Sequence, residues 1–186
     1  MTDGEAALEE IERCSRAGLK GIGELRPTKS AFSRTHRSAL DSVVAAAQEH
    51  HLIFLFHVSE PVGHLYAGKG NSYPNVVYPF IVRYHEVPVV LAHWGGGLLF
   101  YSLMPKVTQA LKNVYFDTAA SPFLYRADIF RYAVELVGAE KILFGSDFPL
   151  MPYRRALGAV HEAPLTAEEK ELVLGRNAQR LLSWEG

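Results

Sequence analysis

Two spacings of hydrophobic residues alternate along the chain. Continuous apolar runs are typical of strands buried on both faces, and they occur at residues 19–25, 52–58, 87–93, 113–119 and 141–147. The segments around them have helical periodicity and predict helices at 4–17, 38–50, 75–84, 98–111, 126–137, 153–161 and 167–183. Thr166 and Glu169 have the spacing of a capping box, which supports the start of the last helix. Strands that alternate with helices in this way indicate an α/β fold with a parallel sheet.

Composition narrows the class of protein. A chain of 186 residues without a linker or a low-complexity tract predicts one domain over residues 1–186. Its 20 acidic and 19 basic residues nearly cancel, so nothing suggests a nucleic-acid or membrane partner. The apolar runs are much shorter than the roughly 20 residues that span a bilayer. The acidic N-terminus does not resemble a signal peptide, and the single Cys14 fits a reducing compartment, so we expect a cytoplasmic protein.

A polar side chain stands at the end of each predicted strand. These residues are Glu24, His57, His93, Asp117 and Asp147. Because the carboxyl ends of parallel strands share one rim of the sheet, we expect these side chains to lie there. One histidine in such a place is more often a structural residue, but two histidines with two carboxylates favour a site for zinc or another divalent metal. Asp117 can equally cap the segment that follows it.

The segments around these residues resemble a known family. In order they are GIGELRP, HVSEPVGH, LAHWGGG, VYFDTAASP, ILFGSDFPL and GRNAQRLL. Together they resemble the amidohydrolase superfamily, and most closely its branch of amidohydrolase-related metal-dependent hydrolases and decarboxylases. The resemblance covers residues 18–183, and AHWGGG and FGSDFP are its most discriminating parts. It implies a partial (β/α)₈ TIM barrel built from barrel strands four to eight, with a divalent metal that is zinc or, alternatively, manganese or iron.

The resemblance also implies roles for the residues at the strand ends. His57 and His93 would face the metal, although in some members the second histidine contacts the substrate or the metal-bound water. Asp147 would bind the metal and act as general base, so it and His93 are the candidate catalytic residues. Glu24 would lie where related hydrolases carry a carboxylate that bridges two metals.

The loop at residues 57–74 would lie over this site and contact a small-molecule substrate. Glu60, His64 and Lys69 in the loop, together with Trp94 beside His93, are the candidate substrate-binding residues. The alternative for the loop is a solvated connection without a functional role.

Two further features near the strand ends have both a functional and a structural interpretation. The three glycines at residues 95–97 can adopt conformations closed to other residues, and they either admit substrate or form a turn before a helix. Arg26 and Arg34 are either carboxylate clamps or surface residues.

One part of the family pattern is missing from the sequence. The H-x-H pair of the first barrel strand occurs nowhere, and a closed barrel typically needs about 250 residues. We therefore expect barrel strands one to three to be absent. The leading hypothesis is a metal-dependent hydrolase in which metal-activated water attacks a C–N, C–O or related bond of a small molecule. The alternatives are a non-oxidative decarboxylase and a catalytically inactive chain, and a homo-oligomer would be unsurprising.

Overall fold

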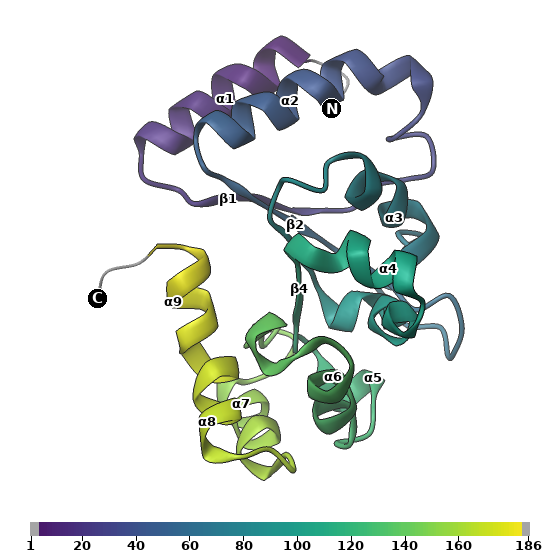
Figure 1. Cartoon of the computed structure of the whole chain (residues 1–186), viewed down its shortest axis with the longest axis vertical. Coiled ribbons are helices and arrows are strands. Elements are labelled where there is room, and N and C mark those ends of the chain that lie inside the picture. Colours follow the sequence, from purple (N-terminus) through teal and green to yellow (C-terminus); the bar gives the residue numbers. More distant parts are fainter. Residues whose placement is uncertain (1–3, 184–186) are drawn as a thin grey trace.

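The computed structural model describes residues 4–183, except for the side chain of Arg34. One sheet of five strands runs through the molecule (Figure 1). The strands are β1 (Gly21–Leu25), β2 (Ile53–Phe56), β3 (Val89–Leu91), β4 (Val114–Asp117) and β5 (Ile142–Leu143). All neighbouring strands are parallel, so the predicted α/β fold with five parallel strands is confirmed.

The order of the strands in the sheet follows their order in the chain, β1-β2-β3-β4-β5. In a doubly wound sheet the order reverses at a switch point, whereas consecutive order is typical of the wall of a barrel. Right-handed crossovers between consecutive parallel strands place the connecting helices on one face of the sheet. The other face and the carboxyl ends of the strands are therefore the places to look for a site.

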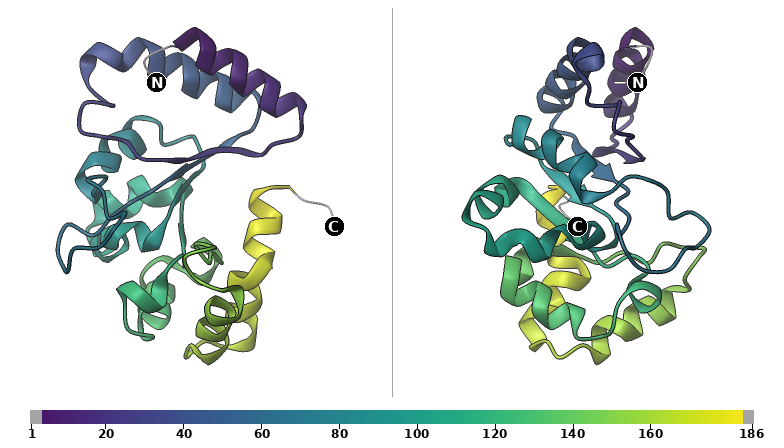
Figure 2. Two further views of the ribbon diagram at one scale, coloured as in Figure 1. Left: turned by 180° about the vertical axis from the view of Figure 1, so that it is seen from behind. Right: turned by 90° about the vertical axis from the view of Figure 1, so that its right-hand side faces the viewer.

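Helices gather at both ends of the sheet. In Figures 1 and 2, α1 (Gly4–Arg16) and α2 (Arg37–Glu49) lie side by side near β1, and the last helices of the chain gather at the opposite end. Those that follow α2 are α3 (Pro74–Arg83), α4 (Pro105–Ala110), α5 (Ser121–Leu124), α6 (Ile129–Val137), α7 (Tyr153–Glu162), α8 (Ala167–Glu171) and α9 (Asn177–Leu181). Short 3-10 segments are η1 (Arg34–His36), η2 (His93–Leu103), η3 (Leu111–Asn113) and η4 (Ala139–Lys141). None of the helices within residues 4–183 is long and apolar enough to cross a membrane.

Two helices differ from their predictions. In place of one helix at 98–111, the irregular η2 ends before Met104 and Pro105 then starts α4, because proline suits the first turn of a new helix but not the interior of a continuing one. The predicted helix at 167–183 does begin at a capping box between Thr166 and Glu169. It then passes through a π-helical segment, η5 (Leu172–Arg176), before α9.

The hydrophobic core lies between the sheet and the helices. The rings of Phe54 and Phe56 on β2 pack against Phe80 of α3, with centroids 5.3 and 4.9 Å away. All three rings are buried, and burying one such ring contributes roughly 1.5–3 kcal/mol. Because side chains alternate along a strand, Leu55 points to the opposite face, where it is only partly buried. The next residue of that alternation is His57.

Candidate metal centre

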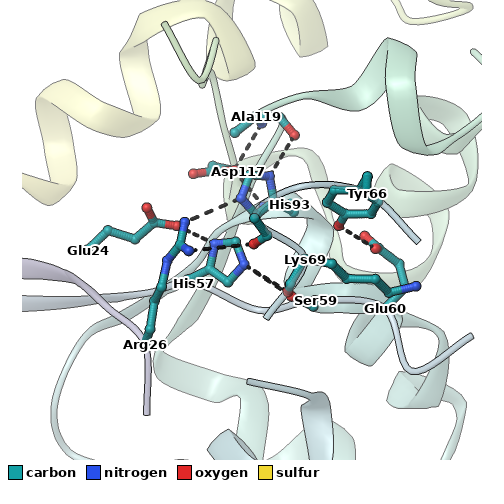
Figure 3. Close-up of polar contacts among 11 residues, drawn as sticks. Glu24, Arg26, His57, Ser59, Glu60, Tyr66, Lys69, His93, Asp117 and Ala119 are labelled. Carbon is teal, nitrogen blue, oxygen red and sulfur yellow. Dashed lines mark hydrogen bonds and ion pairs between the residues drawn. The ribbon is translucent and has the colours of Figure 1, made fainter. Parts of the chain in front are cut away.

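Three of the predicted ligands meet at the carboxyl ends of β1, β2 and β3. Figure 3 shows Glu24, His57 and His93 converging from these neighbouring strands. The Nδ1 atom of His57 lies 2.8 Å from Oε1 of Glu24, and Nε2 of His93 lies 3.7 Å from the same oxygen. The ligand atoms of all three lie within 4.8 Å of one another, close enough to hold one metal ion.

The ring of His93 is oriented by a backbone carbonyl. Its Nδ1 atom lies 3.2 Å from the carbonyl oxygen of Ala119, which can only accept a hydrogen bond. Nδ1 therefore carries a proton, and in the neutral ring the lone pair on Nε2 faces Glu24. The backbone of His93 has a left-handed φ of 57°, and its amide donates to Oδ1 of Asp117 at 2.9 Å. Strained, fully anchored backbone of this kind is common at functional sites.

His57 is oriented in a similar way from the other side. Its Nε2 atom lies 3.0 Å from Oγ of Ser59 and 3.4 Å from the carbonyl oxygen of Lys69. A proton on Nε2 is therefore satisfied, and Nδ1 is left to face Glu24. Metal-binding histidines usually donate their second nitrogen to a carbonyl or carboxylate in this way. Two imidazole nitrogens and one carboxylate oxygen fit zinc or a similar divalent metal.

The three side chains also shift each other's charge state. The hydrogen bond with His57 and the interaction with His93 hold the pKa of Glu24 well below its usual range. Burial lowers the pKa of His93, but the Glu24 carboxylate and the charge of Asp117 outweigh it and raise the pKa to about 9. Without a metal, Glu24 is thus ionised and His93 is protonated at neutral pH. A bound metal would take the place of that proton.

His57 and His93 border a cavity of about 520 Å³, which we call the metal-side pocket. Its other walls include Arg26, His64, Phe123, Asp147 and Phe148. Nη1 of Arg26 lies 3.5 Å from the carbonyl oxygen of Gly68, so the guanidinium reaches across to the loop that follows β2. The pocket combines apolar walls with a few convergent polar groups, as ligand sites usually do.

Comparison with known proteins identifies the family of the chain. The sequence model of the amidohydrolase family matches residues 1–184. The chain belongs to the amidohydrolase family. No curated protein matches the sequence at a significant level.

Solved structures show the same fold in other amidohydrolases and decarboxylases. The 5-carboxyvanillate decarboxylase of Sphingomonas paucimobilis superposes with a TM-score of 0.78 at 20% identity, over 97% of this chain and 64% of that one. A dihydroxybenzoic acid decarboxylase of Polaromonas sp. JS666 with bound manganese has a TM-score of 0.67 at 18% identity, over 97% and 66%. An amidohydrolase of Burkholderia multivorans with bound zinc has a TM-score of 0.52 at 18% identity, over 95% and 70%. The five strands of this amidohydrolase thus form part of a TIM barrel, and the chain spans less than two thirds of the length of the first of these neighbours.

Asp147 lies farther along the chain than the end of the observed strand β5. It lines the metal-side pocket, but the close group of ligand atoms found within residues 4–183 does not include it. The strand β5 ends at Leu143, and the chain continues through Gly145 and Ser146 to a turn where Asp147 has a φ of 63°. Asp147 therefore lies beyond the strand end, where its charge still acts on His93.

The three loop residues proposed for substrate binding differ in their distance from the metal-side pocket and in their contacts. His64 lines the metal-side pocket. Lys69 is buried, and its Nζ atom donates to the carbonyl oxygens of Val62 and His64 at 2.9 and 3.0 Å, so it holds the loop together. Glu60 accepts a hydrogen bond from the hydroxyl of Tyr66 at 2.9 Å and lines an adjacent cavity.

The predicted substrate contact of Trp94 needs correction. Its side chain is fully buried, packs edge-on against Phe130, and donates from Nε1 to Oγ of Ser121 at 2.6 Å. It does not border the metal-side pocket. Trp94 is therefore a residue of the hydrophobic core.

The glycines after His93 serve packing within the protein. A Cβ atom on Gly96 would lie 2.4 Å from the carbonyl oxygen of Ser59, and one on Gly95 would lie 2.9 Å from the ring of Phe116. Their φ values of 57° and 62° also favour glycine. The close approach that Gly95 and Gly96 permit is therefore that of the protein's own chain.

Sequence reasoning missed two groups that orient the histidines. Ser59 follows His57 by two residues, which places both on one side of an extended chain, and this spacing was a usable signal. The carbonyl of Ala119 has no signal in the sequence, because any residue could supply it. Asp117, left open between the rim and a cap, accepts the backbone amides of His93 and Ala119. The side chain of Arg34 is not among those that the structure describes.

Proposed function

We propose that this amidohydrolase is a metal-dependent enzyme that acts on a small molecule bound in the metal-side pocket. The observation that carries the proposal is the convergence of Oε1 of Glu24, Nδ1 of His57 and Nε2 of His93 within 4.8 Å. A divalent metal held by these atoms would act as a Lewis acid and would lower the pKa of its bound water to about 7. Zinc and manganese are the first metals to test, since similar structures carry them.

We assign the proton transfer to Asp147. Its carboxylate borders the same pocket as the histidines but stands apart from the close group of ligand atoms. A carboxylate in that position can accept a proton from the attacking water and return it to the leaving group. His64 on the same pocket wall would contact the substrate.

Hydrolysis is the first candidate reaction, because a metal site beside a carboxylate base fits the attack of water on a carbonyl or related centre. Decarboxylation is the second candidate, and a specific observation favours it. The guanidinium of Arg26 lines the pocket, where it suits a carboxylate of the substrate. Two of the similar structures are decarboxylases.

The decisive experiment is a metal titration of the chelator-treated protein by calorimetry. We expect one zinc or manganese ion to bind, with affinity reduced at least about 10-fold in His57→Asn and His93→Asn, since each variant removes a ligand. His85→Asn, which changes an exposed histidine, is the control and should bind as the wild type does. Equal metal affinity in all four proteins would rule out this centre.

A product assay then separates the two reactions. Candidate esters, amides and aromatic acids are incubated with the metal-loaded protein while carbon dioxide and hydrolysis products are both measured. Turnover that stops with chelator and returns with metal supports an enzyme, and the product identifies the reaction. A protein that binds metal but turns over none of these substrates would favour the catalytically inactive alternative.

A further inference from the structure

A second cavity adjoins the metal-side pocket. Its volume is about 380 Å³, and it shares the walls formed by His64, Tyr66 and Leu124. We call it the Glu60 pocket, because Glu60 is the carboxylate among its lining residues. The aromatic rings that line it belong to His64, Tyr66, Phe100, Tyr101 and Tyr125. Figure 3 shows Glu60 and Tyr66 beside the cluster of Glu24, His57 and His93.

The carboxylate of Glu60 is only half satisfied. Oε2 accepts a hydrogen bond from the hydroxyl of Tyr66 at 2.9 Å, whereas Oε1 is buried and has no hydrogen-bond partner. Glu60 also forms no ion pair with any other residue in the part of the chain that the structure describes. A buried carboxylate oxygen normally has a donor or a cation beside it. Oε1 of Glu60 therefore lacks a positively charged or hydrogen-bond-donating group beside it.

Lys69 lines the same pocket but does not supply that group. Its Nζ atom donates to the carbonyl oxygens of Val62 and His64, and it lies 5.6 Å from the centre of the Tyr66 ring. Lys69 thus holds the loop closed around the pocket. The Nζ atom of Lys69 therefore makes its hydrogen bonds to backbone carbonyls and not to the Glu60 carboxylate.

The tyrosine hydroxyls do not supply it either. Burial raises the pKa of Tyr66, and its hydrogen bond to Glu60 raises it further. Burial likewise raises the pKa of Tyr125, and the charge of Glu60 adds to the effect. Both hydroxyls stay neutral, so the negative charge on the pocket wall belongs to Glu60.

We propose that the Glu60 pocket binds a protonated amine of the substrate. The ammonium group would donate to the Glu60 carboxylate and lie against the aromatic rings, whose faces attract cations. The inference rests on the proposed function in one respect, since it places the reacting end of the same molecule in the adjoining metal-side pocket. The substrate class is then a small molecule with an ammonium group on one end and the reacting group on the other.

The test measures binding without metal, so its outcome does not depend on the metal centre. Benzylamine, protonated at pH 7, and the neutral benzyl alcohol are titrated by calorimetry into the protein in excess chelator. We expect the amine to bind at least about 10-fold more tightly than the alcohol. Glu60→Gln should remove that preference, and Glu86→Gln, a change at an exposed carboxylate, should keep it.

Tyr101→Leu provides a second variant that the fold tolerates, because the Tyr101 side chain is 55% exposed. It removes one ring, and the amine should bind about three-fold more weakly while the alcohol changes less. Equal affinity of amine and alcohol for the wild type, or an undiminished preference in Glu60→Gln, would overturn the proposal. If Glu60→Gln does not fold, the wild-type preference and its reduction in Tyr101→Leu decide the matter.

The two proposals fail separately. If the protein prefers the amine through Glu60 but binds no metal, the proposal for the Glu60 pocket is supported and the proposed metal-dependent enzyme is contradicted. Metal binding by Glu24, His57 and His93 without any amine preference would do the reverse.

Discussion

The Oδ1 atom of Asp117 accepts hydrogen bonds from the backbone amides of His93 and Ala119, each at 2.9 Å. It therefore ties the end of β3 to the segment that follows β4. The carbonyl of Ala119 in turn accepts from Nδ1 of His93. One carboxylate thus controls both the backbone and the ring orientation of a proposed metal ligand.

Replacing Asp117 should therefore weaken metal binding from a distance. Asp117→Ala leaves two amides without their acceptor, and we expect a loss of about 1–3 kcal/mol in the free energy of unfolding. Metal affinity should fall about 10- to 100-fold, as is typical when a residue that orients a ligand is removed. Asp117→Asn keeps an acceptor oxygen and should lose less of both. Urea unfolding and calorimetric metal titration measure the two effects.

The control for this prediction is Asp128→Asn. Asp128 is a half-exposed carboxylate that pairs with Arg126 at the surface, and its replacement should change neither quantity appreciably. An unchanged metal affinity in Asp117→Ala would show that His93 does not need this anchor.

Stability without metal should fall at alkaline pH. In the folded protein the pKa of His93 is about 9, against 6.5 for an ordinary histidine. Since folding favours the protonated ring, its contribution is complete below pH 6.5 and is lost as pH rises through 9. The decline should amount to at most ~3 kcal/mol between these pH values. The decline is measured as the change in the midpoint of urea unfolding between pH 6 and 10, in excess chelator.

The same experiment on Glu24→Gln tests the cause. The Glu24 carboxylate helps to hold the pKa of His93 high, so the variant should show a smaller decline between pH 6.5 and 9. At the acid end the sign is opposite. The pKa of Glu24 is lowered from 4.5, so its contribution is present above that value and disappears as pH falls further. Parallel curves for the variant and the wild type would contradict this account.

Added metal should stabilise the folded protein through the same three side chains. A ligand that binds only the folded state adds about 2.7 kcal/mol at 100 times its dissociation constant. We expect zinc to raise the thermal midpoint of the wild type, and the rise to be much smaller in Glu24→Gln. Scanning calorimetry with and without zinc measures it. An equal rise in both proteins would place the ion elsewhere.

The meeting of Glu24, His57 and His93 was predictable from the sequence. Each residue follows an apolar run, and the carboxyl ends of parallel strands share one edge of the sheet. The order of the strands then makes the three residues neighbours. The position of Asp147 was not predictable in the same way, because β5 contains only Ile142 and Leu143 and a turn then directs the chain. A pattern of apolar residues does not show where strand pairing stops.

Contacts between segments that are distant in the chain could not be predicted from the sequence either. Trp94 follows the proposed ligand His93 in the sequence, yet its indole lies in the core, where it donates to Ser121 and packs against Phe130. The glycine run after His93 suggested room for a ligand. Its actual neighbour at Gly96 is the backbone of Ser59, which no local spacing reveals.

That contact at Gly96 leads to a prediction with an internal control. In Gly96→Ala the new methyl group would meet the carbonyl oxygen and carbon of Ser59 at 2.4 and 2.7 Å. Both are backbone atoms that cannot rotate away, and the φ of 57° adds strain, so we expect a destabilisation of about 2–5 kcal/mol. The side chain of Ser59 is also hydrogen-bonded to Nε2 of His57. A shift of Ser59 would therefore disturb His57, so metal affinity should fall together with stability.

Gly158→Ala makes the same chemical change inside α7, where a Cβ atom would meet nothing within 4 Å. Alanine is favoured over glycine in the middle of a helix, so this variant should gain about 0.5–1 kcal/mol and bind metal as the wild type does. Urea unfolding and metal titration of the two variants side by side separate packing at the site from the general effect of adding a methyl group. A Gly96→Ala protein as stable as the wild type would mean that the segment after His93 does not press against Ser59.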